Sequence, residues 1–364
     1  MNESLGLYLH IPFCLSKCRY CDFFSGLAGE AEKKDYVSAL EKRIRALGRE
    51  DGVRPFTSVY FGGGTPTSVG ADGLCRLLEA VRSVGLAEGA EVSFEANPAT
   101  VDGAGLSLLR RTGFNRVSFG VQSFVPRELS TLGRIHSAAE AAETVRAAGE
   151  AGFVNVSLDL MLGIPHQTKE SALFSVGEAV SLGVSHVSAY CLKLEPGTKM
   201  YAQYPDGKGL PSEDEVADIY LSVVSALEEE GLGQYEISNF AREGFACRHN
   251  LLYWQLGEYI GLGPTAHSLF KGQRFEFPPR RELSGDFGSV FEEAIPEDTD
   301  PETEYTMLSL RTSGGISSKK LTKTAAAKFE NYVRAGFARR TEEGYALTPR
   351  GFLVSTQIIS DILF

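Results

Sequence analysis

The sequence predicts an α/β fold in which a parallel sheet forms a partial or full barrel, followed by a small second domain. Strand-like apolar runs alternate with helical stretches from Leu5 to Leu192, and repeated strand–helix units of this kind build parallel sheets. The chain has 364 residues, whereas a single hydrophobic core rarely grows beyond roughly 250 to 300 residues. A second domain is therefore expected after the barrel.

Six runs have the length and composition of strands, and the stretches between them show helical periodicity. The expected strands are 5–11, 57–61, 91–96, 115–120, 155–161 and 186–192. The expected helices are 30–47, 74–84, 138–149 and 171–182. Six strands without internal repeats fit a barrel better than a sandwich, although periodicity alone also allows an open doubly wound sheet. Both architectures bind ligands at the carboxyl ends of their strands.

The composition changes between Phe275 and Glu304, where the chain becomes rich in proline and acidic residues. Such a segment is typical of a linker or an elaborated loop. We therefore expect a barrel over 1–275, a linker over 276–304 and a C-terminal domain over 305–364. The last part combines helical patterns with GYALTPRGF, a hairpin-like stretch before a final apolar helix. This order predicts a small winged-helix-like fold.

The charge and hydropathy of the chain exclude several classes of partner. A formal net charge of −11 disfavours nucleic acid, because proteins that bind it usually present a concentrated basic face. No apolar run approaches the ~18 residues of a membrane-spanning helix, and the residues before Leu9 lack the basic segment of a secretion signal. We expect a cytoplasmic protein without a transmembrane segment.

Cys14, Cys18 and Cys21 form a C-x3-C-x2-C motif directly after the first expected strand. The chain has six cysteines, too few for a disulfide framework, and the clustering of three of them indicates a metal site. Three thiolates from one loop can ligate three irons of a four-iron cluster and leave the fourth iron open to another ligand. A zinc site completed by His10 is the alternative, but zinc knuckles usually come in pairs and no second knuckle is present.

Further polar and glycine-rich motifs fall at the ends of the next strands. The run from Phe61 to Pro66 (FGGGTP) follows the second strand, and its glycines allow a close backbone approach to an anionic group. Glu95, Gln122 and Asp159 fall at or near the ends of three later strands, where a barrel places its binding groups. Each of these three residues also fits a simple loop cap.

The cysteine motif resembles that of the radical S-adenosylmethionine (SAM) superfamily. Together with GGGTPT, FEANP, GVQSF, LDLMLGIP, EPGT, YEISNFA and HNLLYW, it resembles the oxygen-independent coproporphyrinogen III oxidase family, in particular its HemW branch, over nearly the whole chain. The resemblance implies a radical SAM barrel with a C-terminal HemN-type domain and a [4Fe-4S] cluster on the three cysteines. It also implies SAM contacts from Tyr8, Tyr20, Gly63, Gly64, Thr65, Glu95, Gln122, Arg134 and Asp159.

Two features favour the HemW branch over the oxidases of this family. The oxidases carry a further cysteine two residues after the cluster motif, where this chain has Phe23, and a longer N-terminal extension. The HemW branch shows H-N-x-x-Y-W, found here from His249 to Trp254. The resemblance then implies a heme chaperone that passes heme to membrane-bound respiratory proteins, with His249 as the axial ligand. It also implies a reduced flavodoxin or ferredoxin-type electron donor.

Two other functions stay open at this point. One is a SAM-dependent oxidative decarboxylase that converts coproporphyrinogen III to protoporphyrinogen IX, which would make the protein an oxidoreductase. The other is a radical enzyme acting on another tetrapyrrole or small molecule. His267, in the stretch GPTAH, is a second candidate heme ligand. All of these functions require the cluster, but only the chaperone returns its ligand unchanged.

Overall fold

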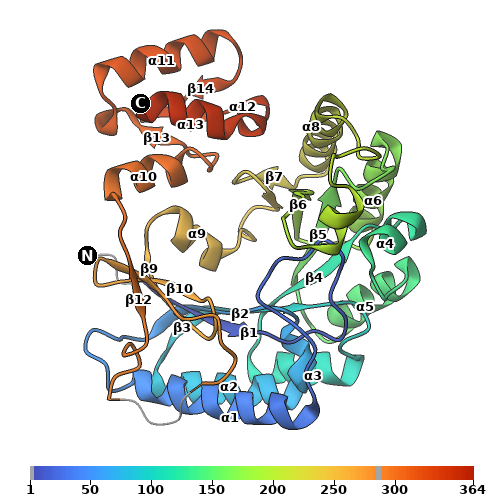
Figure 1. The fold of residues 1–364 in the computed structure, drawn as a ribbon, viewed down its shortest axis with the longest axis vertical. Helices are drawn as coiled ribbons and strands as arrows, with labels where there is room; N and C mark the ends of the chain where they lie inside the picture. Colours follow the sequence, from blue (N-terminus) through green and yellow to red (C-terminus); the bar gives the residue numbers. More distant parts are fainter. Residues whose placement is uncertain (1–3, 284–287) are drawn as a thin grey trace.

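The structure, a computed structural model, describes residues 4–283 and 288–364, and its main body is one 12-stranded sheet with helices on its outer side (Figure 1). Six consecutive parallel strands form the centre of this sheet. They are β1 (Leu5–Ile11), β2 (Phe56–Gly63), β3 (Leu86–Ala96), β4 (Arg116–Gln122), β5 (Asn155–Leu162) and β6 (His186–Cys191). All six predicted strands are therefore present, in the predicted order.

The helices of the main body include all four that the periodicity predicts. These are α1 (Glu30–Leu47), α2 (Gly70–Val84), α5 (Ala138–Glu150) and α6 (Lys169–Ser181). Helices that the sequence analysis did not predict are α3 (Gly103–Thr112), α4 (Pro126–Leu132), α7 (Lys199–Gln203), α8 (Glu213–Glu229) and α9 (Arg248–Trp254). Ser137 and Glu140 form a capping box at the start of α5, which satisfies backbone amides that a helix end leaves free.

Shorter strands extend the sheet on both sides of the parallel centre. The strands beyond β1 are β9 (Glu258–Leu262), β10 (His267–Phe270), β11 (Gln273–Glu276) and β12 (Ile295–Glu297), and those beyond β6 are β8 (Asn239–Ala241) and β7 (Gly233–Gln234). β12 and β7 are the two edges of this sheet within the described residues. The barrel is thus partial rather than closed, and the doubly wound alternative is wrong because the six parallel strands follow one another in chain order.

Side chains that face the barrel lumen are mostly polar, whereas those that face the outer helices are apolar. Successive side chains of a strand point to opposite faces, so residues two apart share a face. On β3, Val92 and Phe94 belong to the hydrophobic core, and Glu91, Ser93 and Glu95 alternate with them. Hydrogen bonds between inward residues of the other strands are Ser118–Asp159 and Ser157–His186. The lumen is therefore a polar interior enclosed by an apolar shell.

The last part of the chain forms a three-stranded antiparallel sheet with four helices. Its elements are α10 (Pro301–Ser309), β13 (Ile316–Ser317), α11 (Lys323–Arg334), β14 (Ala338–Arg340), β15 (Gly344–Leu347), α12 (Pro349–Leu353) and α13 (Ser355–Leu363). β14 and β15 form the hairpin, whereas Thr348 accepts a hydrogen bond as the N-cap of α12. The stretch GYALTPRGF is thus one strand and one helix, and the predicted hairpin lies a few residues earlier.

The segment expected as a linker packs against the barrel in its described residues. β12 pairs with β11, and Glu293 forms an ion pair of 2.8 Å with the buried Arg43 of α1. The bounds of the expected linker remain a prediction. None of the described helices has the length and apolarity that crossing a bilayer requires.

We predict that Phe114→Ala lowers the free energy of unfolding by about 3 to 5 kcal/mol, because a cavity opens where the ring packed. Phe114 is fully buried and lies 5.0 Å from the ring of Phe61 and 5.3 Å from that of Phe94, between centroids. Val154→Ala is the control, since Val154 is 75% exposed and its loss should cost less than about 0.5 kcal/mol. Urea denaturation followed by circular dichroism measures the free energy of unfolding of both variants. Equal losses of stability in the two variants would contradict this packing.

Candidate functional site

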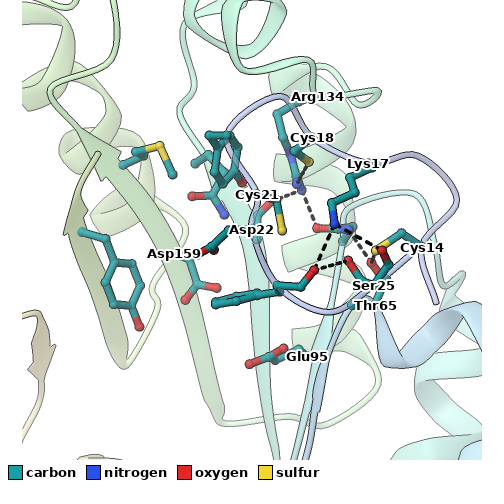
Figure 2. Close-up of a pocket in the computed structure, with 18 of the residues that line it drawn as sticks. Cys14, Lys17, Cys18, Cys21, Asp22, Ser25, Thr65, Glu95, Arg134 and Asp159 are labelled. Atoms are coloured by element: carbon teal, nitrogen blue, oxygen red, sulfur yellow. Dashed lines mark hydrogen bonds between the residues drawn. The ribbon is translucent and has the colours of Figure 1, made fainter. Parts of the chain in front are cut away.

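The three clustered cysteines lie on a loop that covers the carboxyl ends of the parallel strands. The loop leaves β1 and is closed at its base, where the Cys14 amide donates to the Gly26 carbonyl (2.9 Å) and the Gly26 amide donates to the Pro12 carbonyl (3.0 Å). Cys14, Cys18 and Cys21 line a pocket of about 410 Å³, whose other walls come mainly from the ends of β2 to β6 (Figure 2). The predicted arrangement of cysteine loop and strand ends is thus present as one pocket.

The structure brings almost all of the predicted SAM contacts into this pocket. Those that line it are Tyr20, Gly63, Gly64, Thr65, Glu95, Gln122, Arg134 and Asp159. Tyr8 does not line it. Its hydroxyl contacts His10 Nδ1 at 3.1 Å, and its ring stacks on that of Tyr60. The binding roles of all these residues are still predictions, but their gathering at one place is a property of the fold.

The glycines of the GGGTP run allow the cysteine loop to approach β2 closely. A Cβ atom on Gly64 would lie 2.7 Å from the Phe13 carbonyl oxygen and 3.0 Å from Cys14 Sγ. Gly63 has φ +115°, a conformation that other residues rarely adopt, and a Cβ there would lie 2.9 Å from the His10 ring. The space that a side chain would need is therefore already occupied by the protein, which the sequence analysis did not foresee.

A chain of side-chain hydrogen bonds connects two of the three thiols, those of Cys14 and Cys18. Thr65 Oγ1 contacts Cys14 Sγ at 3.7 Å and accepts from Asn97 Nδ2 at 2.8 Å. Arg134 donates through one nitrogen to the Asn97 side-chain oxygen and through the other to Cys18 Sγ, the latter at 3.1 Å. Donors of this kind orient cluster ligands and stabilise thiolate charge. Arg134 is thus half-buried, with its guanidinium against the Cys18 thiol.

The sulfur atoms of Cys14, Cys18 and Cys21 do not all lie within 4.8 Å of one another. Zinc–sulfur bonds of about 2.3 Å place thiolates of one tetrahedral site roughly 3.8 Å apart. Within the described residues, only His267, Glu276 and Glu297 bring three possible ligand atoms within 4.8 Å of one another. The three thiols are thus not gathered as closely as the ligands of one zinc ion, and the assignment of a cluster to them stays a prediction.

Two half-buried carboxyl groups, those of Glu95 and Asp159, line the pocket below the cysteine loop (Figure 2). Burial, followed by the nearby Asp159, raises the pKa of Glu95 to about 7, although Tyr60 donates to Glu95 Oε1 at 2.9 Å. Burial also raises the pKa of Asp159, which accepts from Ser118 at 3.0 Å. Two carboxyl groups in a low-dielectric pocket favour a cationic ligand, because such a ligand stabilises their ionised forms.

Gln122 adopts a strained backbone conformation at the edge of the pocket. Its φ is +71°, in the left-handed region, and the pairing of β4 with β5 is irregular between Phe119 and Gln122. Strain of this kind costs about 1 to 3 kcal/mol and is concentrated at functional sites. Gly120 makes room for the bend, since a Cβ there would lie 2.8 Å from the Asn97 side-chain oxygen.

His249 lies in α9, on the lumen side of β2, and is fully buried. Its Nδ1 contacts Ser58 Oγ at 2.8 Å, and its Nε2 contacts the Tyr253 hydroxyl at 2.7 Å. Burial, together with the charge of Arg116, lowers the pKa of His249 to about 3, so the imidazole is neutral as a metal ligand must be. Both ring nitrogens are nevertheless occupied, so heme ligation requires one of these two contacts to break.

His267 lies apart from α9, on the exposed side of β10. Its Nδ1 contacts Glu297 at 2.8 Å, and its Nε2 lies 3.6 Å from Glu276. Glu276 belongs to β11, the strand next to β10, and Glu297 to β12, the strand beyond it. His267 is therefore held by acidic groups at the surface, an environment different from that of His249.

Several pocket residues were missed by the sequence analysis. Asn97 follows Glu95 in the same FEANP motif and could have been singled out with it. Lys17 lies inside the cysteine motif and donates to the Phe23 and Ser25 carbonyls at 3.0 and 3.2 Å. Tyr190 is the last but one residue of β6 and lines the pocket, so the rule that selected residues near the ends of the earlier strands also selects it.

Comparison with protein-family models matches residues 8–174 to the radical SAM superfamily. Comparison with curated proteins finds the heme chaperone HemW of Bacillus subtilis, 32% identical, with 98% of each chain covered. HemW of Mycobacterium tuberculosis is 34% identical, and the match covers 100% of this chain and 95% of that protein. HemW of Escherichia coli is 41% identical, and the match covers 72% of this chain and 69% of that protein.

Comparison with solved structures finds coproporphyrinogen III oxidase (HemN) from Escherichia coli, a radical SAM enzyme. Its TM-score is 0.81 at 22% identity, and the match covers 99% of this chain and 90% of that one. At this identity the match supports the predicted fold, including the part beyond the barrel, but not a shared reaction. Because the full-length sequence matches are to HemW proteins and residues 8–174 match the superfamily model, this chain belongs to the HemW family of radical SAM proteins.

Proposed function

We propose that this protein is a heme chaperone, which binds heme and passes it to heme-requiring respiratory proteins of the membrane. The observation that carries the proposal is the sequence match to proteins named heme chaperone HemW, which extends over 95% or more of both chains in two cases. The H-N-x-x-Y-W motif at the start of α9 supports it, because it supplies a neutral imidazole. The proposed site of action is the cytoplasm.

We further propose that Cys14, Cys18 and Cys21 hold a [4Fe-4S] cluster and that SAM occupies the pocket beneath it. Such a cluster supplies an iron with an open coordination position and a single electron that can cleave SAM. Thr65 and Arg134 contact two of the thiols, and Glu95 and Asp159 offer carboxylates to a cationic ligand. A reduced flavodoxin or ferredoxin-type protein is the proposed electron donor.

The oxidative decarboxylation of coproporphyrinogen III is the alternative function. The fold match to HemN supports it only at the level of architecture. In this chain Phe23 stands two residues after the cysteine motif, and its side chain is 65% exposed. The cysteine that the oxidases carry there is absent, which favours the chaperone.

We predict that replacing any one of Cys14, Cys18 or Cys21 with Ala abolishes the cluster, since each supplies one iron–sulfur bond. Anaerobic reconstitution of the unchanged protein should give about four irons per chain, measured by iron and sulfide analysis. The double variant Cys75→Ser, Cys191→Ser is the control and should keep the full iron content. Stoichiometric zinc in the reconstituted protein, with no bound iron, would contradict the assignment.

We predict that SAM binding strengthens as the pH rises through about 7. Glu95 is ionised above its pKa of about 7, and the positive charge of SAM favours that form, so affinity is lost as the pH falls below 7. The loss should approach tenfold per pH unit at the acid end, measured by equilibrium dialysis. Glu95→Gln should bind more weakly and lose most of this dependence, whereas Glu195→Gln at the pocket rim should retain it. A flat profile for the unchanged protein would show that Glu95 does not contact SAM.

We predict that protein without SAM binds heme and that His249→Ala lowers the affinity at least tenfold. The Soret band should also change, because losing an axial imidazole alters the ligand field of the iron. His267→Ala is the matched control and should keep both the affinity and the spectrum. The iron–sulfur signal should be unaffected in both variants, since His249 and the cysteine loop are separate. Unchanged heme binding in His249→Ala would show that another residue ligates the heme iron.

A further inference from the structure

Tyr60 connects the SAM pocket with the helix that carries His249. It lies on the lumen side of β2, where its hydroxyl donates to Glu95 Oε1 at 2.9 Å. Its ring stacks on the His249 imidazole, with centroids 5.4 Å apart and planes inclined by 23°. It also stacks on Tyr8, its register partner on β1, at 6.3 Å. The Tyr60 side chain thus contacts both Glu95, a proposed SAM-binding residue, and His249, the proposed axial residue for heme.

The position of His249 depends on the same strand and its neighbours. Ser58, two residues before Tyr60 on the same face, holds Nδ1 of the ring. Glu91 on β3 accepts from the backbone amides of Arg248 and His249, at 3.1 and 3.0 Å, and so fixes the start of α9. Gly6 of β1 leaves room for the helix, because a Cβ there would lie 2.9 Å from Leu252 Cδ1. α9 is therefore docked closely in the lumen, with its histidine on the Tyr60 ring.

The two ligands make opposite demands on this arrangement. Heme ligation needs a free ring nitrogen, so the contact of His249 with Ser58 or with Tyr253 must break. An imidazole that turns toward the iron also leaves its stacking on Tyr60. A cation bound at Glu95 keeps that carboxyl ionised, and a hydroxyl donates more strongly to a carboxylate than to a neutral acid. A firmer bond to Glu95 holds Tyr60, and with it His249, in the buried position.

We propose that SAM binding at Glu95 and heme ligation by His249 oppose each other, with Tyr60 as the positioning residue that links the two sites. The inference rests on the proposed function and assigns a regulation to it: SAM binding favours release of heme. Linkage requires the effect to be reciprocal, so heme must weaken SAM binding by the same factor by which SAM weakens heme binding. Coupling between two sites usually amounts to about 5- to 150-fold in affinity.

The test measures heme affinity in cluster-loaded protein, with and without saturating SAM and with no reductant, so that SAM is bound but not cleaved. Trp254 is the only tryptophan of the chain and lies in α9, so quenching of its fluorescence reports heme binding next to His249. Three proteins are compared: the unchanged chain, Tyr60→Phe and Tyr36→Phe. Tyr60→Phe keeps an aromatic ring for stacking and removes the hydroxyl that donates to Glu95. Tyr36 is the matched control, a buried tyrosine whose hydroxyl donates to the His10 carbonyl.

We expect SAM to weaken heme binding at least fivefold in the unchanged protein and in Tyr36→Phe, and less than twofold in Tyr60→Phe. The converse titration, with SAM added at fixed heme, should give matching factors. Equal heme affinity with and without SAM in the unchanged protein, or a full effect in Tyr60→Phe, would overturn the inference while leaving the chaperone function intact. A failure of SAM-free protein to bind heme would instead overturn the proposed function, and this inference with it.

Discussion

The hydrogen-bond chain from Cys14 through Thr65, Asn97 and Arg134 to Cys18 is the interaction on which the rest of the site depends. It joins the cysteine loop to the ends of β2 and β3 and to the turn after α4. It acts together with backbone bonds of the same loop, among them the Arg19 amide to the Leu132 carbonyl at 3.1 Å, to fix the three thiols over the barrel. Because Gly64 lets β2 approach the loop, Cys14 can meet Thr65, and the chain can form. The pocket thus depends on backbone packing as much as on the side chains that line it.

The polar lumen below this chain explains how two proposed ligand sites can share one barrel. Parallel strands of alternating character place apolar residues outward against the helices and polar residues inward. A lumen filled with carboxyl, hydroxyl and imidazole groups transmits a change through hydrogen bonds and charge, whereas an apolar core would transmit it only through packing. Tyr60 lies where the pocket half of the lumen meets the half occupied by α9.

Much of this architecture was predictable from the sequence. The six strands and four of the helices follow from hydrophobic periodicity, and the cysteine motif indicated where the pocket lies. Short elements such as α4 and β12 were not predictable, because they depend on tertiary contacts. The pocket residue Asn97 was missed since its role depends on Arg134, a residue distant in sequence. The hydrogen bonds at both His249 ring nitrogens could not be predicted either, because Ser58 is distant from His249 in sequence and contacts it only in the folded protein.

The central claim is that the protein handles heme as cargo rather than a porphyrinogen as substrate. In the most direct test, the cluster-loaded protein is incubated anaerobically with SAM and an electron donor. One sample contains heme and the other contains coproporphyrinogen III. Heme recovery, decarboxylation and SAM consumption are then followed by mass spectrometry. The account predicts that heme is bound and recovered unchanged and that coproporphyrinogen III is not decarboxylated. Protoporphyrinogen IX formed with matching SAM consumption, in protein that does not retain heme, would contradict it.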